Sequence, residues 1–144
     1  MGSVRKSILL GYSAEQMYTL VERIEEYPQF LPWCGGVSVL RDGDDGAVTA
    51  TLTIAIHGFR QSFTTRNRNV PGQSIAMSLV DGPFSKLRGG WLFKPLGDDG
   101  CKVDFGLEYE FSNPVLAGVV GPVFNAVAAS FVESFHDRAK EIYG

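Results

Sequence analysis

Histidine and cysteine are the residue types best suited to catalysis or metal binding in this chain of 144 residues, which has two of each. Cys34 and Cys101 belong to no CxxC pair or Cys/His cluster, so we expect reduced thiols rather than a disulfide or a metal site. His57 is predicted at a hairpin turn, and His136 lies beside an apolar helical stripe, three residues from Glu133. Neither histidine belongs to a triad motif with a serine or cysteine and a carboxylate. The sequence therefore predicts no catalytic residue and no metal ligand.

Cofactor and nucleic-acid signals are also weak. The chain contains no glycine-rich phosphate loop, zinc-ligand spacing or dinucleotide fingerprint, so we expect no cofactor. Thirteen basic and sixteen acidic residues give a formal net charge of −3, which supplies no overall attraction to nucleic acid. We expect no DNA partner, and an RNA partner would need a local basic patch.

One such patch is present between Asp45 and Asp81, a stretch without acidic residues. Arg60, Arg66 and Arg68 share strand parity there and should project together from one face, where they could contact phosphates. The competing interpretation is that charged residues on a solvated strand face simply keep it soluble. Lys102, Asp104, Glu108 and Glu110 support it, because they indicate an outer face of mixed sign.

The stretch YPQFLPWC (27–34) is apolar, aromatic and stiffened by two prolines. Phe30, Leu31 and Trp33 could close the mouth of a pocket or enter an interface with little loss of entropy on ordering. They could equally plug the end of a barrel as core residues. The sequence leaves both interpretations open.

The elements that must position these residues follow from periodicity. Residues 3–10 predict a strand that ends at Gly11, and Ser13 with Gln16 predicts a capping box before a short amphipathic helix over MYTLVERI. Pro28 and Pro32 limit a second helix to about two turns.

Six antiparallel strands are predicted between Gly35 and Ser112, separated by turn signals at 42–46, 57–58, 71–72, 81–83 and 97–100. One strand alternates Val48, Ala50, Leu52, Ile54 and Ile56 with threonine and alanine, and the last alternates Val103, Phe105, Leu107, Tyr109 and Phe111 with mostly acidic residues. Such strands present one apolar face and one solvent-exposed face, so we expect one face of the sheet to pack against an apolar element.

A long C-terminal helix is the predicted cover. Apolar residues recur there at helical spacing, at Leu116, Val120, Phe124, Val127, Ala128, Phe131, Phe135 and Ile142. The first half of this helix is apolar nearly all round, with glycines that permit tight approach and Pro122 as an expected kink. Close packing on the sheet explains this composition, and so does a face that meets lipid or a protein partner.

The order strand, two short helices, six strands and a long helix predicts an α+β helix-grip (START-like) fold over residues 1–144. In it a curved antiparallel sheet of about seven strands wraps around the last helix. The sheet and helix should enclose a pocket, commonly of roughly 300–1,000 Å³ for small ligands. The start MGSVRKSILLGY has too short an apolar run for a signal peptide or membrane span, so we expect a cytoplasmic protein.

Five segments carry a resemblance to a known family: YSAEQMYTLV (12–21), YPQFLPWC (27–34), SFTTRN (62–67), QSIAMSLVDGPFSKLRGGWLFKP (73–95) and VESFHDRAKEIYG (132–144). They resemble the family of coenzyme Q-binding START proteins and bacterial ribosome association toxins, which is grouped with polyketide cyclases. The resemblance implies a ubiquinone-binding protein that supports respiration. The alternative that it implies is a toxin of the toxin–antitoxin kind, which binds the large ribosomal subunit and blocks subunit joining.

Our main interpretation is non-enzymatic binding of ubiquinone or a related polyprenyl lipid, because a cyclase-type enzyme would need an acid or base in a cavity that the sequence makes almost entirely apolar. The expected partners are this ligand, a transient contact with the inner membrane surface, and in the alternative the large ribosomal subunit. The predicted ligand-binding residues are Phe30, Leu31, Trp33, Leu52, Ile54, Phe63, Trp91, Phe105, Tyr109, Phe124, Val127, Phe131 and Phe135. Arg138 falls near the apolar side of the last helix and is a candidate polar anchor, although its long stem can also place the charge at the surface.

Overall fold

The structure is a computed structural model that describes residues 2–41, 47–56 and 58–144. The chain order is β1 (Gly2–Leu10), α1 (Ala14–Glu22), the 3-10 helix η1 (Ile24–Glu26), α2 (Tyr27–Phe30), β2 (Cys34–Arg41), β3 (Ala47–Ile56), β4 (Phe59–Val70), β5 (Ser74–Asp81), β6 (Phe84–Leu96), β7 (Gly100–Phe111), α3 (Pro114–Ala129) and α4 (Phe131–Tyr143). The predicted turn at 42–46 and His57 lie outside the described residues.

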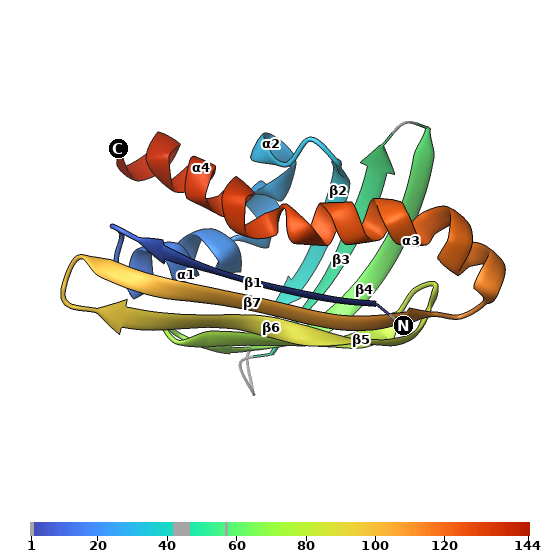
Figure 1. Ribbon diagram of the computed structural model, residues 1–144, viewed down its shortest axis with the longest axis horizontal. Coiled ribbons are helices and arrows are strands. Elements are labelled where there is room, and N and C mark those ends of the chain that lie inside the picture. Colours follow the sequence, from blue (N-terminus) through green and yellow to red (C-terminus); the bar gives the residue numbers. More distant parts are fainter. Residues whose placement is uncertain (1, 42–46, 57) are drawn as a thin grey trace.

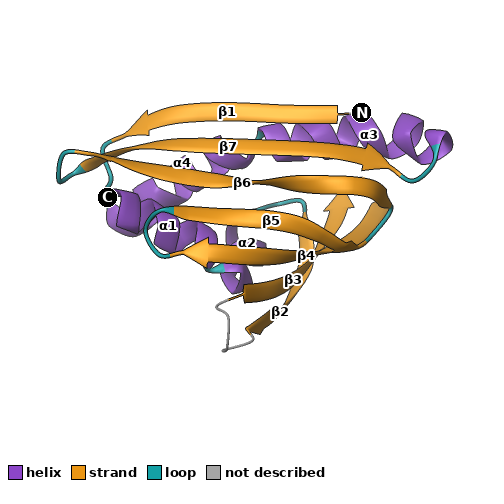
Figure 2. Ribbon diagram, turned by 90° about the horizontal axis from the view of Figure 1, so that it is seen from below, coloured by secondary structure: helices purple, strands orange, loops and turns teal. Residues whose placement is uncertain are grey.

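The described strands form one seven-stranded antiparallel sheet in the order β1-β7-β6-β5-β4-β3-β2. Each strand from β2 to β7 pairs with its sequence neighbour, and β1 closes the far edge against β7. Figure 1 shows β2, β3 and β4 rising beside α3 while β1, β6 and β7 pass beneath it. Figure 2, seen from below, shows the sheet in front and the helices behind it. The predicted helix-grip arrangement is confirmed.

The short helices begin where their side chains supply the caps. The Ser13 hydroxyl accepts from the backbone N–H of Gln16 at 3.1 Å, and the Gln16 side chain accepts from the Ser13 N–H at 2.9 Å. This is the predicted capping box. Pro28 lies in the first turn of α2, which is only four residues long, because Pro32 follows soon after it and a proline cannot continue the hydrogen-bonded ladder.

The inward face of the sheet follows the predicted alternation. In β7 the buried residues alternate with half-buried or exposed ones, and in β3 Val48, Ala50 and Ile54 are buried while Leu52 and Ile56 are half-buried. Residues from opposite ends of the chain share this core, since Met17, Phe105 and Phe135 are each at most 2% exposed. The sheet face and the C-terminal helices therefore form one continuous apolar layer.

The C-terminal segment corrects two details of the prediction. It forms two helices, because Ser130 separates α3 from α4 and its hydroxyl donates to the Val127 carbonyl at 2.7 Å. Ile142 is 48% exposed, because the last turn instead places Tyr143 against α1, where its hydroxyl donates to the Gln16 carbonyl at 3.0 Å. Pro122 lies inside α3, where it cannot donate a backbone hydrogen bond.

The outer side of α3 is apolar and exposed. Val115 is 76% exposed and Val119 is 68% exposed, whereas Val120, Phe124, Val127 and Ala128 face the core. By length and composition the segment from Pro114 to Tyr143 would be able to cross a membrane, and 28% of its most apolar window is buried in the protein. The same test is passed by core helices of soluble proteins, so this finding alone assigns no membrane role.

A close backbone approach between β6 and β7 yields a stability prediction. A Cβ atom added to Gly89 would lie 2.1 Å from the Gly106 carbonyl oxygen and 2.8 Å from the Leu107 Cα, so the backbone would have to shift. We expect Gly89→Ala to lower the free energy of unfolding by about 1–3 kcal/mol, the usual range for overpacking. Urea denaturation measures this change.

The matched control is Gly36→Ala in β2, where a Cβ atom would meet nothing within 4 Å. This variant should leave the stability unchanged or slightly raised, because alanine has fewer unfolded conformations to lose. Equal stabilities for the two variants would contradict the close approach.

Candidate functional site

An apolar cavity of about 50 Å³ lies between the sheet and the helices. Most of the predicted ligand-binding residues line it, namely Trp33, Leu52, Ile54, Phe63, Trp91, Phe105, Phe124, Val127 and Phe131. They come from β3, β4, β6, β7, α3, α4 and the loop before β2. The fold thus brings together residues that are nearly one hundred positions apart in the sequence.

The cavity is smaller than the pocket expected from the sequence. A single water molecule needs about 10–15 Å³ of cavity volume, whereas pockets for small ligands commonly reach roughly 300–1,000 Å³. A ligand with a ring or a chain must therefore displace side chains of the wall. Leu52, Phe63, Met77 and Phe131 line the cavity and are only half-buried, so they are the side chains with the most room to move.

Aromatic rings dominate one wall. The Phe131 ring is stacked between two tryptophans, with its centroid 5.4 Å from that of Trp33 at an interplanar angle of 22° and 6.4 Å from that of Trp91 at 10°. Phe105 adds a tilted contact to Trp91 at 4.6 Å. Flat aromatic faces of this kind suit a planar group in a ligand.

Four predicted residues lie elsewhere. Leu31 and Phe135 are each 1% exposed and belong to the core. Phe30 packs edge-on against Tyr27 and Phe135 and does not line the cavity. Tyr109 borders a separate surface groove near α3, and its hydroxyl donates to Asn125 Oδ1 at 2.9 Å. Within the stretch YPQFLPWC, Tyr27 and Trp33 are the residues that line the cavity.

Sequence reasoning missed the polar part of the lining. Thr65, Asn67 and Asn69 all line the cavity from β4, and the first two are 6% and 3% exposed. The expectation of an almost entirely apolar interior was therefore wrong for this strand. The available signal was strand parity, because these residues alternate with the outward-facing Arg66 and Arg68 in TTRNRN.

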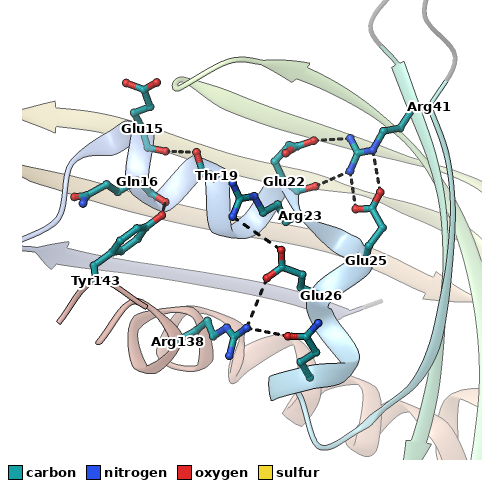
Figure 3. Close-up of polar contacts among 11 residues, drawn as sticks. Glu15, Gln16, Thr19, Glu22, Arg23, Glu25, Glu26, Arg41, Arg138 and Tyr143 are labelled. Atoms are coloured by element: carbon teal, nitrogen blue, oxygen red, sulfur yellow. Dashed lines mark hydrogen bonds and ion pairs between the residues drawn. The ribbon is translucent and has the colours of Figure 1, made fainter. Parts of the chain in front are cut away.

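Arg138 lies between α4 and the α1–α2 region (Figure 3). Its guanidinium pairs with Glu26 at 3.6 Å and Glu141 at 3.5 Å, donates to Gln29 Oε1 at 3.2 Å, and lies 4.8 Å from the centre of the Phe30 ring. The side chain is 12% exposed and does not line the cavity. These contacts fasten α4 to α2.

A second clamp joins the end of β2 to α1 and η1, as Figure 3 shows. Arg41 donates to both carboxylate oxygens of Glu25, at 3.0 and 2.8 Å, and also pairs with the Glu22 carboxylate. The hydrogen bonds from Arg41 lower the pKa of Glu25 and raise that of Arg41 itself. Glu22 lines the cavity, so this clamp also holds one side of its wall.

The predicted arginine row lies on the outer face of β4. Arg60 and Arg68 are exposed and Arg66 is half-buried on that face. Elsewhere the outer face is mixed in sign, since Glu108 pairs with Arg5, Lys86 and Arg88. The hydrogen bond from Arg88 lowers the pKa of Glu108. Arg60 and Arg68 therefore form the exposed basic part of the β4 surface.

The cysteines and His136, which are the residue types best suited to catalysis, do not form a common site. Cys34 and Cys101 are both free thiols, and burial raises the pKa of each. Because the thiolate is the nucleophile, a raised pKa makes these thiols poorly nucleophilic. His136 is half-buried, and its ring meets that of Tyr12 edge-on at 6.5 Å. Among the described residues, no group of three or more His, Cys, Asp or Glu side chains is placed to hold a metal ion.

The curved sheet, the long C-terminal helices and the enclosed apolar cavity define a START-like domain. The family model for polyketide cyclase / dehydrase and lipid transport proteins matches residues 10–136, and the chain belongs to this family.

Its relatives carry two kinds of name. The persistence and stress-resistance toxin PasT of Escherichia coli O6:H1 (strain CFT073) is 47% identical to this chain over 143 residues. The ribosome association toxin RatA of Escherichia coli (strain K12) is 46% identical over 143 residues. Each match covers 99% of this chain and 90% of the relative. The mitochondrial coenzyme Q-binding protein COQ10 homolog B of Xenopus laevis is 29% identical, over 96% of this chain and 58% of that protein.

Solved structures support the same fold. The solution structure of the 18 kDa protein CC1736 from Caulobacter crescentus matches with a TM-score of 0.77 and 30% identity, over 100% of this chain and 99% of that one. The Zhui aromatase/cyclase from Streptomyces matches with a TM-score of 0.78 and 16% identity, over 96% and 93% of the two chains. The second likeness concerns the fold alone.

The Arg41 clamp yields a pH-dependent prediction. Because the folded-state pKa of Glu25 lies below its unfolded value, about 4.3 for glutamate, the stabilisation is present above that pH and is lost as the pH falls through the folded-state pKa. We expect Arg41→Gln to cost about 0.5–1 kcal/mol of unfolding free energy at pH 7, since the pair is partly exposed. At pH 3 the difference in unfolding free energy between this variant and the unmodified protein should be smaller.

Urea denaturation at both pH values measures this difference. Arg23→Gln serves as a control for the loss of a neighbouring positive charge, which pairs with Glu26 at 3.9 Å. A cost for Arg41→Gln that is the same at pH 3 and pH 7 would mean that the clamp does not act through the ionised carboxylates.

Proposed function

We propose that this protein associates with the ribosome, as the name of its relative RatA indicates for that protein. The observation that carries the proposal is identity of 46% over nearly the whole length of both chains, which leaves no separate domain to account for the relative's activity. The large subunit is the proposed partner and interference with subunit joining the proposed consequence.

The outer face of β4 is the proposed contact surface. Arg60 and Arg68 are exposed on it, and Arg66 lies between them on the same face. Arginine binds phosphate oxygens with geometry that lysine lacks, and each phosphate that it neutralises makes binding weaker as salt rises. The overall charge of −3 means that attraction to RNA must come from such a local surface.

Charge reversal tests this surface. The double variant Arg60→Glu/Arg68→Glu should lose co-sedimentation with large ribosomal subunits in sucrose gradients, with affinity at least about tenfold weaker, because two phosphate contacts become repulsions. The salt dependence of any remaining binding should be flatter than that of the unmodified protein.

The control variant Lys6→Glu/Lys140→Glu changes the net charge equally at exposed residues of β1 and α4. It should bind as the unmodified protein does. Undiminished sedimentation of the β4 variant would exclude this face as the contact.

A second function is favoured by the cavity itself. We propose that the domain also binds an apolar ligand of the polyprenyl-quinone type without catalysing a reaction on it, and that it supports respiration in this way. The apolar lining with stacked aromatic rings supports this proposal, as does the resemblance to a protein named coenzyme Q-binding. Burying one five-carbon isoprene unit from water is worth about 4 kcal/mol, so two or three units would outweigh the cost of association.

A polyprenyl tail that moves from a bilayer into the cavity gains little free energy, because the acyl chains of the bilayer are as apolar as the cavity. Selection must then depend on the head group, and the exposed Val115 and Val119 of α3 would provide a transient contact with the inner membrane surface. We place the protein in the cytoplasm, with this contact as a peripheral one.

Absence of catalysis is part of the proposal. Glu22, the carboxylate in the cavity lining, is engaged by Arg41, and His136 lies against Tyr12 outside the lining. A proton-transfer mechanism needs a group within hydrogen-bond reach of a bound substrate, so these positions support binding rather than cyclase chemistry.

Titration with a short-chain ubiquinone tests cavity binding. Both tryptophans line the cavity, so their fluorescence should be quenched as the quinone binds. Trp33→Phe should retain the quenching of Trp91 but bind several-fold more weakly, because it removes stacking area and a hydrogen-bond donor.

The same titration of Leu9→Ala, a change at a 70% exposed residue of β1, serves as the control and should give the affinity of the unmodified protein. A flat signal, together with unchanged affinity of the Trp33 variant by calorimetry, would remove Trp33 from the binding site.

A further inference from the structure

A surface groove of about 760 Å³ crosses the outer face of the sheet. Its lining residues belong to β1, β7, β6 and β5, which follow one another on the face that Figure 2 shows in front of the helices. The strand pairing places one row of residues across this face: Arg5, Gly106, Gly90, Ala76 and, on β4, Arg68. Four strand spacings, about 19 Å, separate the two arginines at the ends of the row.

The floor of the groove carries no long side chain, because the middle of the row consists of two glycines and Ala76. Arg88 and Leu92, four residues apart on β6, lie on either side of this floor, about 13 Å from each other along the strand. The aromatic residues that border the groove, Trp91 and Phe105, are buried on the opposite face of the sheet. Because the outer face offers no ring there for a base to stack on, the groove suits a sugar–phosphate backbone.

The groove has an excess of positive charge. Glu108 in its wall pairs with three cations, which are Arg5 at 3.6 Å, Lys86 at 3.7 Å and Arg88 at 3.2 Å. The side chains of Arg5 and Arg88 are 77% and 67% exposed, so most of their surface is accessible to a partner. Exposed ion pairs contribute little to stability, and a phosphate can therefore share these guanidinium groups at low cost.

The other charged residues near the groove leave this excess in place. Asp104, the second acidic residue of the lining, pairs with Lys102 at 3.7 Å. Arg68 is exposed and forms no ion pair within the described part of the chain. Lys6 also borders the groove, but it shares the strand parity of the buried Val4 and not that of the outer face. The basic surface of β4 thus continues across the sheet to β1.

We propose that this groove holds a single sugar–phosphate strand of RNA, which runs across the β-strands from Arg68 to Arg5 and passes Arg88. Phosphate oxygens accept charge-assisted hydrogen bonds from the guanidinium groups, and the low floor lets the RNA strand approach the sheet closely. The contact reads no base, so it is independent of RNA sequence. This inference rests on the proposed association with the ribosome and extends its contact surface beyond β4.

Two variants test the groove and leave Arg60 and Arg68 unchanged. Arg5→Gln/Arg88→Gln removes two of its cations. Gly106→Val fills the floor: a Cβ atom at Gly106 would meet only the end of the flexible Arg5 side chain, at 3.4 Å, so the backbone need not shift. Valine is also favoured in strands.

Co-sedimentation of the full chain with large ribosomal subunits is measured at several potassium chloride concentrations. The arginine double variant should bind about tenfold more weakly at low salt. The slope of its log affinity against log salt should be shallower by about 1.4–1.8, the value for two phosphate contacts. Gly106→Val should also bind more weakly and with a shallower slope, because its side chain occupies the floor and displaces Arg5.

The controls make the same chemical changes elsewhere. Arg23→Gln/Lys140→Gln removes two positive charges from exposed residues on the helical side of the molecule. Gly36→Val adds the same side chain to β2, where a Cβ atom would meet nothing within 4 Å. Both controls should bind as the unmodified protein does. Circular dichroism melting confirms that each variant is folded, and should Gly106→Val not fold, the arginine double variant decides alone.

Undiminished binding by either groove variant would overturn this inference and leave association through β4 intact. Weaker binding with an unchanged salt slope would overturn it as well, because that pattern indicates a contact with protein rather than with phosphate. If the unmodified protein does not sediment with the subunits, both the groove and the proposed association with the ribosome are wrong.

Discussion

The alternation of side chains along the antiparallel ladder is the constraint on which the rest of the structure depends. Strand β4 demonstrates it, because Thr65, Asn67 and Asn69 face the cavity while Arg66 and Arg68 face outward. The pairing of β4 with β3 and β5 sets this assignment, and a slip by one residue would exchange the two sets. Both proposed functions therefore belong to the same strand: ligand binding to its inner side chains and ribosome association to its outer ones.

Helix packing determines how much space the sheet leaves inside. The side chains of α3 and α4 fill most of the concave face, so the cavity holds only about 50 Å³ without rearrangement. Two arginine clamps hold the surrounding wall, Arg138 between α4 and α2, and Arg41 between β2 and α1. The first half of α3 lacks such a clamp among the described contacts and exposes Val115 and Val119. Opening of the cavity is thus expected by movement of half-buried side chains beneath α3 rather than by displacement of the clamped helices.

Much of the fold was predictable from local signals. The Ser13–Gln16 capping box, the ends of the short helices and the six-strand meander all follow from residue types at fixed spacing. Most of the predicted ligand-binding residues line the cavity, because inward parity and apolar character coincide in β3 and β7. The polar inward residues of β4 were missed because hydropathy assigns asparagine to the surface. The break at Ser130 and the placement of Phe30 and Tyr109 outside the lining depend on tertiary packing, which periodicity does not contain.

The ribosome proposal is tested most directly by electron cryomicroscopy of the protein bound to ribosomal subunits from its own cells. The two-faced sheet predicts density on the large subunit with the outer face of β4 against RNA and with the guanidinium groups of Arg60 and Arg68 at hydrogen-bond distance from phosphate oxygens. Density that contacts the subunit through the helices, or ribosomal particles without bound protein at saturating concentration, would contradict it.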